Sequence, residues 1–82
     1  MSKPVEPRTL RDAHEIATER LPAPDANPAV WLAFRQANAR MYKKVADVDR
    51  GHHHEALYWA AYERRKAGEV SAQIQGGKSE SK

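Results

Sequence analysis

Three consecutive histidines at 52–54 are the residues whose types and spacing most directly suggest chemistry. Acidic residues surround them, with Asp49 three positions before the run and Glu55 directly after it. Imidazole and carboxylate groups bind zinc when side chains three or four positions apart share one helix face. Asp49 with His53 has that spacing if one helix runs through both, and His52 with Glu55 has it if a new helix begins there.

Either pairing supplies only two ligands, whereas a tight zinc site takes three or four. The H-E-x-x-H pattern of metalloproteases is missing, because His54-Glu55 is followed by Ala-Leu-Tyr. We therefore expect no cofactor, and we interpret the run as a helix N-terminus whose histidines cap, pack or lie in water. Metal binding stays open as an alternative, with the candidate ligands His52, His53, His54 and Asp49.

The same histidines could sense pH, because imidazole titrates near neutrality. Charging them together would place repelling cations at a helix N-terminus, where the helix dipole disfavours positive charge. Helix content would then fall as the solution is acidified. The fourth histidine, His14, lies on the apolar face of a predicted first helix. There we expect a half-buried imidazole, with the Asp49–His54 region as its candidate hydrogen-bond partner.

Aromatic residues near the histidines indicate a contact surface. Leu57 and Trp59 point in nearly opposite directions on a helix, and one core-facing stripe cannot cover both. Tryptophan and tyrosine are enriched at binding hot spots, and large exposed apolar patches mark contact sites. We predict a partner-binding surface at Trp59 and Tyr62, with Trp31 and Tyr42 as neighbours. The alternative is that all the tryptophans and tyrosines cover the small core.

This surface predicts a non-enzymatic protein-interaction module, with a protein partner or a homodimer as the bound state. Two basic clusters carry an alternative, a nucleic-acid-binding accessory role; they are Arg40, Lys43 and Lys44, then Arg64, Arg65 and Lys66. Acidic residues accompany both clusters, which is typical of a solvated helix face. A helix-turn-helix also needs a recognition helix with base-reading residues, whereas the candidate here is apolar and aromatic after its histidines.

Length and composition limit the function further. The chain has 82 residues, no cysteine and a formal net charge of +3. A chain of this size buries a modest core, so an interior substrate cleft is difficult to build. It carries no Gly-rich phosphate loop and no nucleophile motif, and we expect no enzyme. No run approaches the roughly 20 apolar residues of a membrane span, and no signal-peptide core is present, so we expect no membrane contact and a cytoplasmic location.

Periodic apolar residues predict an all-α fold, a three-helix arrangement with a short first helix packed on a long antiparallel helical hairpin. Residues 9–75 form a single helical domain between a disordered arm at 1–8 and a disordered tail at 76–82. The first helix begins at Thr9, within the capping-box variant T-L-R-D, and the prolines of P-A-P end it near residue 22.

The second helix starts at Pro28, capped by Asn27, and runs to about Arg50. Gly51 then separates it from a third helix that ends near Ile74, and one long helix bent at this glycine is the alternative. We favour the break, because a glycine in mid-helix costs about 1 kcal/mol and suits a C-terminal cap. The predicted core consists of Leu10, Ala17, Leu21, Val30, Phe34, Ala37, Met41, Val45, Val48, Leu57 and Ala61.

The run from Asn27 to Lys66, together with the earlier L-R-D-A-H-E, resembles small uncharacterised helical proteins of high-GC actinobacteria. The resemblance covers most of the chain outside its two ends. No activity is known for that group, so the resemblance transfers no site residue. It implies a cytoplasmic bacterial protein with an accessory or regulatory role.

Overall fold

Three α-helices and one short 3-10 turn make up the described part of the chain, residues 6–80 of the computed structural model. The elements are α1 at Leu10–Glu19, α2 at Pro28–Val48, the turn at Arg50–His52 and α3 at His53–Glu80. No strand occurs within residues 6–80. The predicted all-α fold, with a short helix on an antiparallel hairpin, is confirmed.

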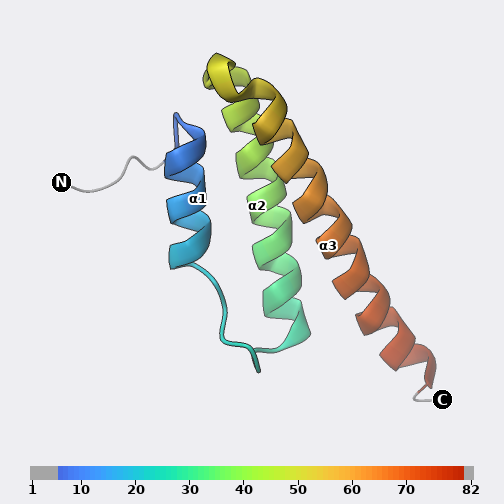
Figure 1. The fold of residues 1–82 in the computed structure, drawn as a ribbon. Coiled ribbons are helices and arrows are strands. Elements are labelled where there is room, and N and C mark those ends of the chain that lie inside the picture. The colour runs from blue at the N-terminus through green and yellow to red at the C-terminus, as the bar shows by residue number, and fades with distance from the viewer. Residues whose placement is uncertain (1–5, 81–82) are drawn as a thin grey trace.

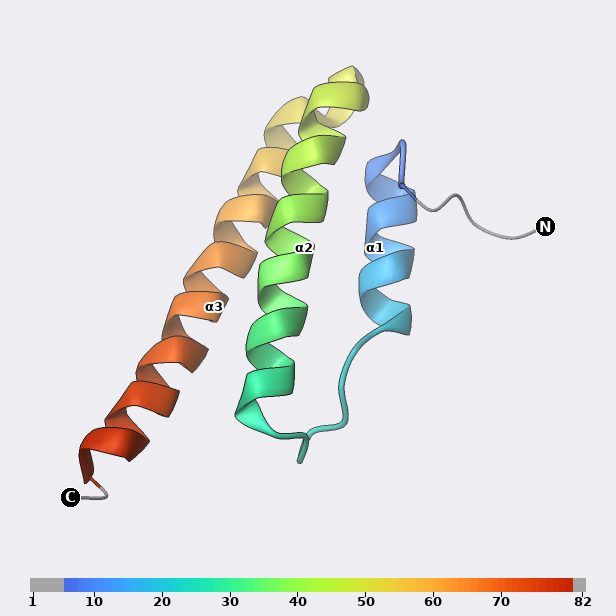
Figure 2. The same ribbon diagram turned by 180° about the vertical axis from the view of Figure 1, so that it is seen from behind.

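The helices lie side by side, with α2 between α1 and α3 (Figure 1 and Figure 2). The Cα positions span 49 × 27 × 15 Å, so the arrangement is close to a single layer. Each helix runs antiparallel to the one before it (Figure 1). A layer of this kind leaves parts of the middle helix uncovered, because only two of its sides meet a neighbour.

The N-terminal signals of the first two helices act as the sequence predicts. Thr9 Oγ1 accepts a hydrogen bond of 3.0 Å from the backbone N–H of Asp12, which caps α1. Asn27 Oδ1 accepts one of 2.8 Å from the N–H of Ala29, and Pro28 occupies the first turn of α2. These local contacts fix where α1 and α2 begin.

The chain is interrupted between α2 and α3 as predicted, although the turn differs from the predicted glycine cap. α2 ends at Val48, two residues before the predicted Arg50, and Asp49 follows as its C-cap. Gly51 lies in the 3-10 turn, and no glycine in the described residues has a positive φ. The prediction that Gly51 caps the C-terminus of α2, which usually requires a positive φ, is therefore wrong. The chain turns through a 3-10 segment instead.

The two ends of the chain are only partly described. Of the arm predicted at 1–8, residues 6–8 lie against α1 and α2, and residues 1–5 fall outside the described part. α3 continues beyond the predicted end at Ile74 and includes residues 76–80 of the predicted tail, while residues 81–82 are not described. Glycine lowers helix propensity without blocking the backbone hydrogen bonds, so the helix can continue through Gly76.

The core is built mainly from small residues. Leu10, Phe34, Met41 and Val45 are buried as predicted, and Ala17, Ala37 and Ala61 are partly buried. The predicted core omitted the buried residues Ala13, Ala46, Ala56, Ala60 and Ala67. Tyr42 is also buried, as in the alternative that the tryptophans and tyrosines cover the core. Alanines at the α2–α3 contact let the two helix axes approach closely, so the interface needs few large side chains.

Four predicted core residues are wrong. Val48 is 59% exposed, Leu21 57%, Val30 50% and Leu57 40%. Leu21 follows the end of α1, and Leu57 lies on the flank of α3 away from Trp59. The apolar stripe of α2 is wider than the surfaces that α1 and α3 cover, so Val30 and Val48 stay at its open edge.

Within the described residues, hydrogen bonds attach α1 and its C-cap to the rest of the fold at three points, one near each end and one in the middle. Asp49 accepts a bond of 2.9 Å from the N–H of Leu10, at the start of α1. The Tyr42 hydroxyl and His14 Nδ1 share a bond of 2.8 Å. At the end of the helix, Arg20 Nε donates to Asn38 Oδ1 at 2.9 Å.

Two valines on α2 provide a matched test of this packing. Val45 is fully buried and Val48 is 59% exposed. We expect Val45→Ala to lower the free energy of unfolding by about 2 kcal/mol, through lost burial and the cavity left behind. Val48→Ala should stay within about 0.5 kcal/mol, because its side chain gains little from folding. Urea unfolding followed by circular dichroism measures both; equal losses would contradict the assigned packing.

Asp49 links stability to pH. Its pKa is lowered, first by the hydrogen bond from the Leu10 N–H and then by the one from His52. The charged carboxylate therefore stabilises the fold fully at pH values above the usual pKa of an aspartate. That contribution disappears as pH falls through the lowered pKa. We expect Asp49→Asn to lower the thermal midpoint at pH 7 and to weaken the loss of stability on acidification.

Asp47→Asn is the matched control, because Asp47 is an exposed carboxylate two positions before Asp49, in the last turn of α2. Thermal melts from neutral to acidic pH compare the two variants with the unchanged chain. Identical acid dependence in both variants would show that the Asp49–Leu10 bond does not contribute.

Candidate interaction groove between α1 and α2

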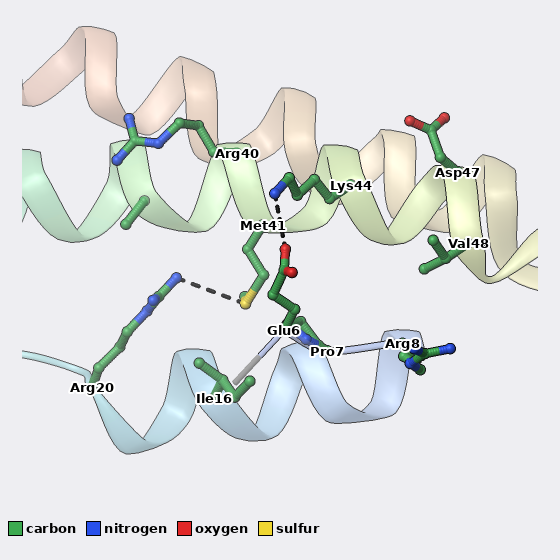
Figure 3. A pocket seen from close by; sticks show the side chains of 11 residues that line it. Glu6, Pro7, Arg8, Ile16, Arg20, Arg40, Met41, Lys44, Asp47 and Val48 are labelled. Atoms are coloured by element: carbon green, nitrogen blue, oxygen red, sulfur yellow. Dashed lines mark hydrogen bonds and ion pairs between the residues drawn. The ribbon is translucent and has the colours of Figure 1, made fainter. Parts of the chain in front are cut away.

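A groove of about 590 Å³ lies between α1, α2 and the segment at 6–8. Its apolar lining comes from all three parts, namely Pro7, Ile16, Ala37, Met41 and Val48 (Figure 3). Met41 forms the floor, being buried, whereas Val48 is exposed at one end. The groove exists because α1 covers only part of the apolar stripe of α2.

Basic side chains surround this apolar floor. Arg8, Arg20, Arg40 and Lys44 line the groove, against two acidic residues, Glu6 and Asp47. In Figure 3, Arg20 and Arg40 lie toward one end, Arg8 lies at the other, and Lys44 lies between them. Four cations and two carboxylates leave an excess of positive charge around a surface that also binds apolar groups.

Arg20 has the most constrained position of these cations. Its guanidinium donates to Asn38 Oδ1 and approaches the Met41 sulfur at 3.7 Å. Burial lowers the pKa of Arg20 and the positive charge of Arg40 lowers it further, while Tyr42 and the carboxylate of Glu63 oppose the shift. A bound anion would offset both effects, because an opposite charge nearby favours the charged guanidinium.

Glu6 reaches into the groove from the N-terminal segment. Its carboxylate accepts a hydrogen bond of 2.9 Å from Lys44 Nζ, and it lies between α1 and α2 in Figure 3. This bond, followed by the charges of Lys44 and then Arg8, lowers the pKa of Glu6. Both side chains of the pair are largely exposed, so the pair contributes little to stability.

The four aromatic residues predicted as a partner surface do not form one patch. Trp59 contacts Tyr42 and Tyr62, with ring centroids 6.3 and 5.4 Å apart. It also meets His14 of α1 edge-on at 5.2 Å, so this cluster joins α1 to α3. Tyr42 is only 2% exposed and belongs to the core, while Trp59 and Tyr62 are partly buried.

Trp31 lies apart from that cluster. Its ring packs edge-on against Phe34 at 5.5 Å, the Arg35 guanidinium lies 5.5 Å from its centroid, and its indole N–H donates to the Ala23 carbonyl at 3.1 Å. These contacts attach the proline-rich connection to the start of α2. Tyr58, which is outside the predicted four, is 59% exposed and packs on Trp59.

Two histidines of the run at 52–54 form hydrogen bonds that stabilise the turn between α2 and α3. His52 Nδ1 donates to Asp49 Oδ2 at 3.0 Å, and His53 Nδ1 donates to the Ala46 carbonyl at 2.6 Å, in the last turn of α2. His54 is exposed and contacts the His53 ring. Within residues 6–80, whose side chains are described to residue 76, no three metal-binding side chains gather in one place.

His14 does not meet the Asp49–His54 region, its predicted partner. It bonds to Tyr42 instead, because α1 runs antiparallel to α2 and places His14 one turn beyond the contact of Leu10 with Asp49. The hydrogen-bonded, partly buried imidazole expected from the sequence is confirmed, with a different partner.

The two predicted basic clusters lie on different helices. Arg40 and Lys44 border the groove on α2, whereas Arg65 and Lys66 both lie over the Tyr62 ring on α3. Lys66 also pairs with Glu69 at 3.5 Å. Lys43 and Arg64 are exposed. No hydrogen bond or ion pair in the described part of the chain connects one cluster to the other.

Sequence reasoning missed the groove itself, including the contributions of Arg8, Arg20 and Ile16. One signal was available, since Val30, Ala37 and Val48 widen the apolar stripe of α2 beyond what a short first helix can cover. The cations were not recognised as a group because they come from three separate segments.

Comparisons of the chain with models of protein families, with curated proteins and with solved structures find no match. Within residues 6–80, no helix combines the length and the apolar character that crossing a bilayer requires.

Tyr42 provides a test of how α1 is held beside the groove. Burial raises the pKa of Tyr42 to about 12, with the charge of Glu63 adding to the shift and Arg20 opposing it. The folded state thus favours the neutral phenol; this stabilisation is complete below the unfolded pKa of roughly 10 and is lost as pH rises toward 12. We expect Tyr42→Phe to cost about 1 kcal/mol at neutral pH, through the lost bond to His14.

The variant should also lose stability less steeply than the unchanged chain between neutral and strongly alkaline pH. Urea unfolding at several pH values measures this difference. Tyr58→Phe, at an exposed ring, is the control and should follow the unchanged chain. A Tyr42→Phe variant with an unaltered alkaline profile would refute the buried, bonded phenol.

Proposed function

We propose that this chain is a non-enzymatic protein-interaction module that binds a protein partner in the groove between α1 and α2. The resemblance to helical actinobacterial proteins favours a cytoplasmic accessory or regulatory role in a bacterium. The observation that carries the proposal is the groove, an uncovered apolar strip of α2 bordered by four cations. An apolar floor with a charged rim is the usual composition of a protein-binding surface.

The aromatic cluster is a second candidate surface for the same function. Tyr58 is exposed beside Trp59, and the neighbouring Leu57 is also exposed. Single exposed apolar residues are normal on small proteins, so this surface has less support than the groove. Binding of a second copy of the chain is one form of either contact.

Photocrosslinking at single positions separates these surfaces. We would replace Val48, Tyr58 or Ala72 with the photoreactive residue p-benzoylphenylalanine; all three are exposed, and they mark the groove, the aromatic cluster and a control face of α3. Each variant is irradiated in an extract of the organism that encodes the chain. We expect a discrete protein adduct from position 48, suppressed by excess unlabelled chain, and none from position 72.

An adduct from position 58 alone would move the interface to the aromatic cluster. Equal labelling at all three positions, or none at any, would contradict the interaction function. Sedimentation equilibrium of the purified chain identifies self-association, because a homodimer would give an adduct of twice the chain mass without extract.

A further inference from the structure

The occupant of the groove can be described from the charges that line it. Arg40 makes no hydrogen bond or ion pair with any described residue, and Arg20 bonds to a neutral amide and a sulfur rather than to a carboxylate. Lys44 donates a hydrogen bond to the Glu6 carboxylate. Among the described residues, this is the only hydrogen bond between a carboxylate and a cation of the groove. Two arginines that form no hydrogen bond or ion pair with a carboxylate among the described residues, beside an apolar floor, suit a ligand that carries carboxylates next to apolar side chains.

The chain's own N-terminal segment already has this composition where it enters the groove. Glu6 places a carboxylate on Lys44 (Figure 3), and Pro7 adds an apolar ring to the lining of the groove. The segment thus shows which chemistry the groove accepts. Since the Glu6–Lys44 pair is exposed on both sides, a competing carboxylate can replace Glu6 with little loss of stability.

The shape of the uncovered strip indicates a helix as the occupant. Val30 and Val48 are 18 positions apart, which is five full turns of α2, so they share one side of that helix. Ala37 lies between them on nearly the same side, and all three are incompletely covered. Ala37 and Val48 line the groove, whereas Val30 extends the strip beyond it. The part inside the groove is roughly 16 Å long, about three turns of α2, and it matches the apolar face of one short amphipathic helix.

We infer that the groove receives an acidic amphipathic helix of the partner, and that Glu6 holds one of its carboxylate positions until the helix displaces it. The inference rests on the proposed function and specifies its ligand. The apolar side chains of the bound helix meet Ala37, Met41 and Val48, while its carboxylates meet Arg20, Arg40 and Lys44. The N-terminal segment then acts as a weak internal competitor, which sets a threshold for binding.

The test uses two labelled peptides and the 82-residue chain. Both are fluorescein-labelled helical peptides with leucines on one face; one has glutamates on both flanks, and the other has lysines at the same positions. Fluorescence anisotropy at physiological salt measures their affinities. We expect the acidic peptide to bind about tenfold more tightly or better, with an affinity that weakens as salt is added.

Matched variants locate the binding. Arg40→Gln should weaken binding of the acidic peptide by about threefold or more. Arg64→Gln, the same change at an exposed arginine of α3, should leave it unaltered. Glu6→Gln should strengthen binding about twofold or more, because it removes the competitor. Glu69→Gln also breaks an exposed ion pair with a lysine and changes the net charge equally, yet it should have no effect.

Equal affinity for the two peptides, or an Arg40→Gln variant that binds normally, would overturn the inference. If Glu6→Gln and Glu69→Gln strengthened binding of the acidic peptide equally, the change in net charge would explain both results. The idea that Glu6 competes with the peptide would then be overturned. Tighter binding of a labelled DNA duplex than of the acidic peptide would overturn it in favour of a nucleic acid. If the peptides fail while crosslinking at position 48 succeeds, the interaction function stands and only its ligand chemistry is wrong.

Discussion

Hydrogen bonds at three points between α1 and the hairpin hold the first helix in place, and the groove depends on them. α1 contains ten residues and buries only Leu10 and Ala13 fully. A helix this short is marginal in water, so its tertiary contacts must supply much of its stability. The bonds from Leu10 to Asp49, from His14 to Tyr42 and from Arg20 to Asn38 are spread along its length. Together they fix its distance from α2 and its rotation.

The hydrogen bond between Arg20 and Asn38 at the end of α1 requires a buried polar side chain, which lowers stability. Asn38 is completely buried, and its side-chain N–H₂ group has no hydrogen-bond partner in the described part of the chain. Leaving a buried donor unpaired costs about 1–3 kcal/mol. The carbonyl oxygen of the same side chain binds Arg20, which sets the end of α1 and one wall of the groove. An apolar residue at 38 would remove the unpaired donor and leave the guanidinium without this acceptor.

The aromatic residues contribute to the same attachment. Trp59 bridges His14 of α1 and Tyr42 of α2, so much of its surface serves the contact between helices. The surplus of apolar surface predicted for the third helix is present in part, at Leu57 and Tyr58. A comparable surplus lies on α2, where it is gathered beside four cations rather than scattered. Because the exposed apolar residues of α2 lie together beside cations, the functional proposal rests on the groove rather than on α3.

Local sequence determined the helices and their starts. Thr9 and Asn27 cap α1 and α2 through contacts within a few residues, and the break near Gly51 follows from propensity over a short segment. Histidine roles were harder to predict, since His53 binds a carbonyl at the end of the preceding helix. That contact requires the turn at Arg50–His52, whose form the sequence left open between a break and a bend.

The sequence by itself therefore determined an all-α chain with an amphipathic second helix and a short first one, because capping and helical periodicity act over one or two turns. Only the tertiary structure decided which part of the α2 stripe stays open and which cations meet there. Val45 and Val48 are both apolar and three residues apart, yet one is fully buried and the other exposed. Their difference arises from where α1 begins and where its hydrogen bonds place it, and those contacts join residues 18 to 39 positions apart.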